Sequence, residues 1–230
     1  MQRRVDLLHM STLNYRNKDD GRPEERARFR MGLFGPSKAD VWKALAGEVG
    51  GTFTRGGFLN CKERVDVKVG RWEITLDCYS VHTGKTTMVF TRMRAPYVNA
   101  DGLRFKISRK SIFTPIGKLL GMQDIEVGFP EFDEAFVIKG NNESQLRRLF
   151  ANERLRQLLG AQKNVHFEVC DDEGWFGAHF PESADELRFH TPGIIKDIDQ
   201  LRNLYEVFAE TLHTLCHIGS AYEDDPGVKV

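Results

Sequence analysis

The sequence has few cysteines and no long apolar run. Its four cysteines are widely spaced and none belongs to a C-x-x-C pair, so neither a disulfide framework nor a zinc ribbon is indicated. No stretch approaches the roughly 20 apolar residues of a membrane-spanning helix, and the N-terminus lacks the apolar core of a secretion signal. We therefore expect a reduced, cytoplasmic protein that does not bind membranes.

The sequence also lacks an excess of charge. The 33 basic residues balance 33 acidic ones, which gives a formal net charge of +0. Without a net positive field there is no long-range attraction for polyanions. This balance argues against a dedicated nucleic-acid-binding protein.

Signatures of catalytic and metal centres are absent as well. No G-x-S-x-G or H-E-x-x-H occurs, and Gly84-Lys85-Thr86 fails as a phosphate-binding loop because Tyr79 replaces the required first glycine. His213 and His217 have the i, i+4 spacing that two metal ligands can use, but no third ligand can be named. The sequence thus predicts no catalytic residue, no metal site and no cofactor, and it favours a protein that is not an enzyme.

The composition divides the chain into three parts. Residues 1–30 are polar and arginine-rich, without apolar periodicity, and we expect a disordered extension there, which could derive from an upstream reading frame. Residues 31–219 are predicted to form one domain, and residues 220–230 a frayed tail.

Three helices are predicted from their N-terminal caps. Ser37 with Asp40 opens a helix over 37–49, which Gly50-Gly51 ends. Asn142 and Asp197 each precede a helix with Gln three residues later and a leucine and aromatic stripe behind it. The last two openings are near copies, which indicates either an internal duplication or the same packing requirement met twice.

Alternating apolar and polar residues predict strands between the helices. Val65, Val67 and Val69 alternate with charged residues, and 72–79 does the same. Turn sequences at 82–85 and 99–102 lead into strands over 86–95 and 103–110, which predicts successive hairpins. The fold class is therefore α+β, an antiparallel β-meander sheet with three packed helices, an order similar to secretion-chaperone-like folds; a closed β-barrel around the C-terminal helix is the alternative.

A basic face is predicted on the second hairpin. Its members share strand parity, so they should stand together on one side of the sheet: Arg92, Arg94, Arg104 and Lys106. Such a cluster could bind a phosphate-bearing ligand. The neighbouring strand places Glu73 and Asp77 on the same side, so ordinary cross-strand ion pairing is the competing interpretation.

A second candidate surface is an acidic and aromatic loop. It follows a predicted strand over 165–169 and contains Asp171, Asp172, Glu173, Trp175 and Phe176. The calcium-loop spacing is missing. Two large apolar side chains in a loop need a core or a partner to cover them, so the loop is predicted to take part in an interaction.

Several phrases carry a resemblance to known sequences. They are Gly70-Arg71-Trp72-Glu73-Ile74-Thr75-Leu76-Asp77, Thr91-Arg92-Met93-Arg94-Ala95-Pro96-Tyr97, Gly121-Met122-Gln123-Asp124-Ile125-Glu126-Val127-Gly128, Phe132-Asp133-Glu134-Ala135-Phe136-Val137-Ile138-Lys139 and Asp171-Asp172-Glu173-Gly174-Trp175-Phe176-Gly177. Together they resemble a family of bacterial cytosolic proteins with no established activity. The resemblance implies one continuous domain over about 32–219 and no particular chemistry.

These observations favour a non-enzymatic protein-binding or adaptor module of the bacterial cytosol. Its partner would be another protein or a second copy of the chain, and not nucleic acid or a membrane. The alternative is a domain or enzyme that holds a phosphate-bearing small molecule on the basic sheet face.

Overall fold

The computed structural model describes residues 35–56, 63–110, 123–171, 180–181 and 183–228. The chain divides into Met1–Gly35 and Pro36–Val230, so all described residues except Gly35 belong to the second unit. The predictions for residues 1–30 and for most of the acidic loop lie outside the described residues.

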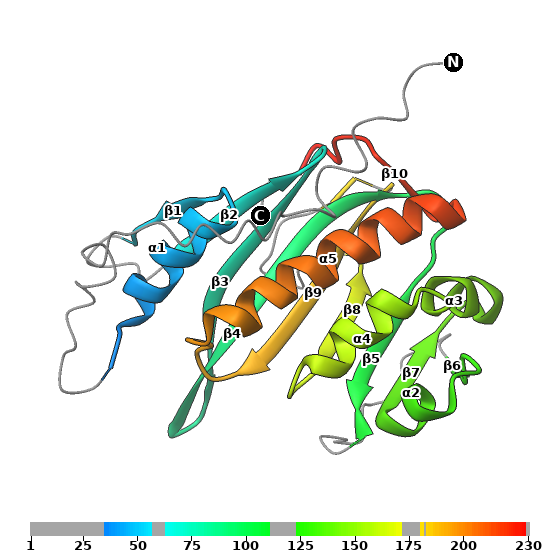
Figure 1. The fold of residues 1–230 in the computed structure, drawn as a ribbon, viewed down its shortest axis with the longest axis horizontal. Coiled ribbons are helices and arrows are strands. Elements are labelled where there is room, and N and C mark those ends of the chain that lie inside the picture. The colour runs from blue at the N-terminus through cyan, green and yellow to red at the C-terminus, as the bar shows by residue number, and fades with distance from the viewer. Residues whose placement is uncertain (1–34, 57–62, 111–122, 172–179, 182, 229–230) are drawn as a thin grey trace, which may run out of the picture. The chain divides into compact units, whose positions relative to one another are not determined.

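The second unit is built on one large antiparallel sheet (Figure 1). The hydrogen-bonded order is β1-β2-β3-β4-β9-β8-β5-β7-β6, with β10 added to β4. The strands are β1 Thr52–Thr54, β2 Arg64–Val69, β3 Trp72–Thr83, β4 Thr86–Asn99, β5 Phe105–Arg109, β6 Gln123–Asp124, β7 Phe136–Gly140, β8 His166–Cys170, β9 Ala184–Pro192 and β10 Ala221–Tyr222.

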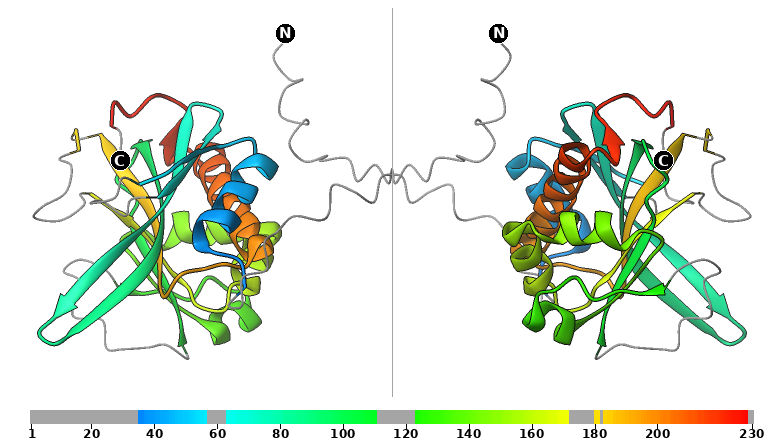
Figure 2. Two further views of the ribbon diagram at one scale, coloured as in Figure 1. Left: turned by 90° about the vertical axis from the view of Figure 1, so that its left-hand side faces the viewer. Right: turned by 90° about the vertical axis from the view of Figure 1, so that its right-hand side faces the viewer.

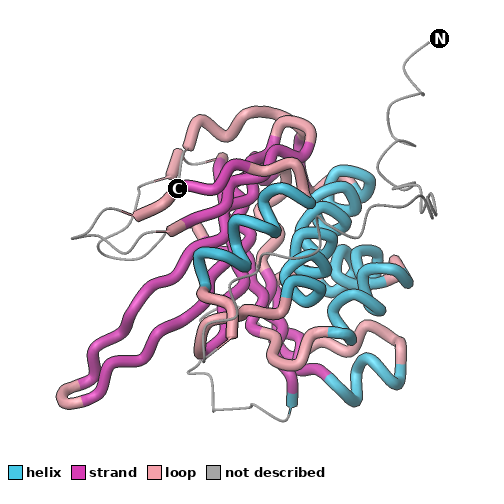
Figure 3. Tube along the Cα trace, turned by 60° about the vertical axis from the view of Figure 1, so that its left-hand side comes forward, coloured by secondary structure: helices cyan, strands magenta, loops and turns pink. Residues whose placement is uncertain are grey.

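Helices cover one face of this sheet (Figures 2 and 3). They are α1 Lys38–Glu48, α2 Pro130–Ala135, α3 Glu143–Phe150, α4 Glu153–Ala161 and α5 Ile198–Ile218. The α+β class with an antiparallel sheet is therefore confirmed. Within the described residues the sheet is open, with β1 and β6 at its edges, so the closed-barrel alternative is wrong.

The predicted caps start the helices where expected. The backbone N–H of Asp40 donates to Ser37 Oγ at 3.2 Å, and that of Gln145 donates to Asn142 Oδ1 at 3.2 Å. Asp197 caps α5, which ends at Gly219 with φ 82°, a left-handed conformation that suits glycine. The helix predicted after Asn142 is in fact two helices, because Asn152 provides a second N-cap.

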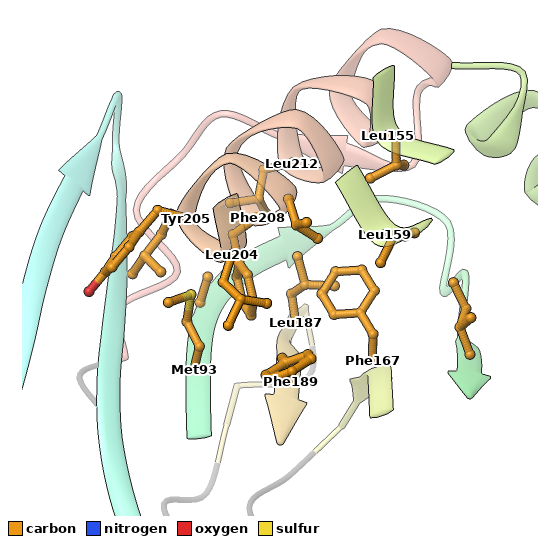
Figure 4. Close-up of a cluster of buried hydrophobic side chains, with 14 of the residues drawn as sticks. Met93, Leu155, Leu159, Phe167, Leu187, Phe189, Leu204, Tyr205, Phe208 and Leu212 are labelled. Atoms are coloured by element: carbon orange, nitrogen blue, oxygen red, sulfur yellow. The ribbon is translucent and has the colours of Figure 1, made fainter. Parts of the chain in front are cut away.

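The core lies between the sheet and helices α4 and α5 (Figure 4). Phe167 of β8 and Phe208 of α5 meet edge to face with ring centroids 5.4 Å apart, and both are fully buried. Burying one such side chain stabilises the fold by about 2–3 kcal/mol. The buried positions of β2 and of the first residues of β3 match the alternation read from the sequence.

Two details of the sheet differ from prediction. Strands β4 and β5 do not form a hairpin, since β9 and β8 lie between them. The turn itself forms, with Asn99 Oδ1 accepting the N–H of Gly102 at 2.9 Å, but pairing with β9 over eight residues outweighs the local connection. In addition, Ala221 and Tyr222 of the predicted frayed tail pair with Asn99 and Val98.

Candidate functional site

The open face of the sheet, opposite the helices, carries a continuous row of polar side chains. Residues that lie directly across from one another on successive strands β3, β4, β9, β8, β5 and β7 are Thr75, Arg94, Arg188, Glu168, Lys106 and Lys139. Because side chains alternate between faces, this register places all of them on one surface. Arg94 and Lys106 of the predicted basic face belong to this row, on strands that are not neighbours in the sheet.

The four predicted basic residues all contact carboxylates. Arg92 binds Asp77 through two hydrogen bonds of 2.9 and 2.8 Å, and Arg94 reaches the same carboxylate at 2.7 Å. Lys106 Nζ lies 3.0 Å from Glu168.

Arg104 likewise has two acidic partners. Its guanidinium contacts Asp171 at 2.6 Å and Asp185 at 3.5 Å. Carboxylates on neighbouring strands and loops thus neutralise the positive charge of these four side chains. A phosphate would have to compete with those carboxylates for the same N–H groups. These contacts are the ion pairs that the sequence predicts as the alternative to a phosphate site.

One carboxylate in this network is unusual. Glu186 is fully buried, and neither of its oxygens has a hydrogen-bond partner among the described residues. The nearest cations, Arg94 and Arg188, each approach to 4.0 Å. Burial raises the pKa of Glu186 to about 7, an effect that the two arginines only partly offset. Burial also lowers the pKa of Arg94.

Half-buried aromatic rings form a second row on the same face. Tyr79 stacks on Phe90 with centroids 5.2 Å apart, Phe90 meets His190 edge-on at 6.2 Å, and His190 stacks on His166 at 4.9 Å. Burial lowers the pKa of His190 to about 4, so this imidazole is neutral at pH 7. A neutral, stacked pair of imidazoles is suited to packing on the sheet.

Two side chains with reactive groups, Cys170 and His213, are held in packed surroundings. Burial raises the pKa of the Cys170 thiol well above its ordinary value, which suppresses the nucleophilic thiolate. His213 of the i, i+4 pair packs against Trp72 with ring centroids 5.5 Å apart. In the described part of the chain, no three His, Cys, Asp or Glu side chains are grouped as a metal site would require.

Strands β3 and β4 form a ribbon that extends past their neighbours (Figures 1 and 3). Strand β2 pairs with β3 only through Trp72–Leu76, and β9 pairs with β4 only from Thr91 onward. The distal part of the ribbon, residues 80–89, is exposed throughout. Val81, Met88 and Val89 are 38%, 43% and 36% exposed.

The ribbon was not singled out from the sequence as a site. The sequence feature that could have identified it is the length of the two β-prone segments on either side of the Gly84 turn. β3 and β4 have 12 and 14 residues, whereas the adjacent strands β2 and β9 have 6 and 9. Of the predicted interaction loop, Asp171 is exposed and held by Arg104. Asp172, Glu173, Trp175 and Phe176 lie outside the described residues.

Comparison with protein-family models and with curated protein sequences gives no match. Among solved structures, the chain is similar to the crystal structure of the mycobacterial trehalose monomycolate transport factor A, TtfA, with a TM-score of 0.45 and 10% sequence identity. The similarity covers 77% of this chain and 95% of that chain. Among the described residues, no helix combines the length and apolar character needed to cross a bilayer.

Proposed function

We propose that the protein is a non-enzymatic protein-binding module and that the β3–β4 ribbon is its contact surface. The supporting observation is the extension of the ribbon beyond β2 and β9, which leaves the backbone edges of residues 80–88 without a neighbouring strand in the described structure. On the β4 side the last neighbour is Gly193, whose N–H donates to the Val89 carbonyl oxygen at 2.8 Å. Unpaired N–H and C=O groups on a strand edge are a template for another strand. The partner is an extended segment of another protein or the same ribbon of a second copy.

The side chains of the ribbon support this assignment. Val81 and Met88 lie across from each other on one face, and His82 and Thr87 form the next pair. Lys85 at the turn is the one charged residue between Ser80 and Phe90. Natural sheets protect exposed edges with charges, prolines or bulges, and this run has little of that protection, as expected for an edge that a partner covers.

The test compares association with fold stability. Val81→Lys combined with Met88→Lys places two charges on the exposed ribbon face, and Tyr222→Lys on β10 is the control, since Tyr222 is 57% exposed but lies outside the ribbon. We expect the double variant to lose self-association in light scattering, or recovery of a stoichiometric partner from a bacterial lysate, with an unchanged melting temperature. The control should retain both.

Two results would contradict the proposal. A strictly monomeric protein without a partner, together with turnover in a broad hydrolase screen, would show an enzyme instead. Stabilisation by a sugar phosphate or nucleotide that Arg94→Ala abolishes would favour ligand binding on the sheet face, for which the predicted contacts are Arg92, Arg94, Arg104 and Lys106.

A further inference from the structure

A groove of about 620 Å³ lies away from the sheet face and the ribbon. It is bounded by α2, α4, the end of β5 and the start of β7, which lie side by side in Figure 1. Arg109, Phe129, Phe136 and Arg156 are among its lining residues. Its volume falls within the range of small-molecule sites.

Two arginines in this groove are fixed by backbone carbonyl groups. Arg109 donates to the carbonyl oxygens of Gln162 at 2.8 Å and Gly160 at 2.5 Å, at the end of α4. Arg156 donates to the carbonyl oxygen of Phe150 at the end of α3. Both guanidinium groups are therefore held in place before any ligand binds, which reduces the entropy cost of binding.

Each guanidinium also lies over an aromatic ring. Arg109 sits 4.8 Å from the centroid of Phe136, and Arg156 sits 3.5 Å from that of Phe129. The bonds to carbonyl groups do not use Nη1 of Arg109 or Nε and Nη2 of Arg156. A stacked, planar guanidinium can offer such N–H groups to an anion. Neither arginine has a carboxylate within ion-pair distance among the described residues, in contrast to the sheet-face cations.

The acidic residues of the groove are at its rim. Glu131 and Glu153 are exposed, and Glu153 accepts a hydrogen bond from Gln157 at 3.0 Å. Charges in water are strongly screened, whereas the half-buried arginines are screened less. Glu131 and Glu153 therefore repel highly charged anions only weakly. Inside the groove the positive charge of the two guanidinium groups dominates.

The remaining wall of the groove is apolar and rigid. Phe129, Pro130, Phe132, Ala135 and Phe136 provide it. The carboxylate of Asp133 accepts the N–H groups of Val127, Gly128 and Phe129 at 2.9, 2.9 and 3.0 Å, which fixes the backbone that carries Phe129. A ligand must therefore present an apolar body as well as an anionic group.

We propose that this groove binds a small organic carboxylate whose apolar body packs on the phenylalanine wall and whose carboxylate is held by Arg109 and Arg156. The inference is independent of the protein-binding role of the ribbon, because no residue lining the groove belongs to β3 or β4. A free inorganic anion would make no use of the apolar part of the groove, and a neutral hydrocarbon would give the two guanidinium groups no anionic partner.

The experiment is calorimetric titration of the full chain with 2-naphthoate, octanoate, 2-naphthamide and inorganic phosphate. We expect at least one carboxylate to bind, and the neutral amide and the phosphate to bind at least tenfold more weakly. Naphthoate and octanoate distinguish an aromatic from an aliphatic body. Equal binding of 2-naphthoate and 2-naphthamide, or no binding of either carboxylate at millimolar concentration, would overturn the proposal.

Three variants locate the site. Arg156→Lys keeps the charge but loses the planar fork. Ala135→Leu adds bulk to the groove and leaves both arginines in the sequence. Each should weaken carboxylate binding about tenfold. Arg154→Lys is the control, since Arg154 lies on the same helix but pairs with Glu206 and does not line the groove. Unaltered affinity in a folded Ala135→Leu variant would place the binding elsewhere and refute the assignment.

Discussion

Arg94 Nη1 and Glu186 Oε2 lie 4.0 Å apart, and both side chains are buried. This separation is too long for a hydrogen bond. The arginine therefore attracts the Glu186 carboxylate but donates no hydrogen bond to it. Because burial removes water as well, the charged form is disfavoured and the pKa of Glu186 rises to about 7. The sheet face opposite the helices thus contains a buried side chain, Glu186, whose charge changes near neutral pH.

Replacing Glu186 should change how stability depends on pH. Its pKa is about 7 in the fold against 4.5 in the unfolded chain, so between these values the folded state keeps a proton that the unfolded state releases. Glu186 therefore stabilises the fold below pH 4.5 and loses that contribution, up to about 3 kcal/mol, as pH rises to 7. Glu186→Gln should raise the free energy of unfolding at pH 8, as measured by urea denaturation.

His190 acts in the opposite direction and provides an internal check. Its pKa is about 4 in the fold against 6.5 in the unfolded chain, so its contribution grows as pH rises from 4 to 6.5. The two slopes partly cancel in the native protein. In Glu186→Gln the rise from pH 4 to 6.5 should become steeper, and an identical pH profile for both proteins would contradict the burial argument.

Loss of the carboxylate shared by Arg92 and Arg94 should be costly. Asp77 accepts three charge-assisted hydrogen bonds from these side chains, and removing one partner of a half-buried ion pair costs about 3 kcal/mol. We expect Asp77→Asn to lower the free energy of unfolding by this amount. Asp224→Asn, which affects an exposed pair with Arg71 at 4.0 Å, should leave it unchanged; equal effects would mean that burial does not matter here.

Two glycine-to-alanine substitutions should have opposite signs. A Cβ on Gly140 would come within 2.3 Å of Leu146 Cδ1 and 3.1 Å of the Arg104 carbonyl oxygen, so overpacking should cost about 1–3 kcal/mol. Gly47 lies in α1, and apart from its chain neighbours and the backbone of its own helix no atom lies within 4 Å of the added carbon. Alanine there should stabilise by up to about 1 kcal/mol. Chemical denaturation measures both, and destabilisation by Gly47→Ala would contradict the helical propensity argument.

Asn152 should contribute more than an ordinary helix cap. It accepts the N–H of Leu155 at 3.1 Å and also donates to Glu210 at 2.6 Å and Thr214 at 2.9 Å on α5. Asn142 caps α3 and makes no bond to α5. We expect Asn142→Ala to cost about 1 kcal/mol and Asn152→Ala to cost about 2 kcal/mol in the same denaturation assay. Equal losses would show that the contacts with α5 add nothing.

Local features were predictable because their causes are local. Ser37, Asn142 and Asp197 define helix starts through bonds to residues two or three positions later, and alternation assigned the faces of β2, β3 and β4. The same logic would have found the α3–α4 break, since Asn152-Glu153 follows the same capping rule. Caps and alternation act within a few residues, so one sequence is enough to read them.

The order of the strands and the pairing of charges depended on the tertiary structure. Arg92 and Arg94 meet Asp77 within the β3–β4 hairpin, as strand parity predicts. The insertion of β9 and β8 between β4 and β5 decides instead that Arg104 meets Asp185 and Lys106 meets Glu168. Arg109 and Arg156 likewise become groove residues only when β5 and α4 come together. These contacts join residues far apart in sequence. They form because the whole packed sheet is stable, and no single segment contains enough information to predict them.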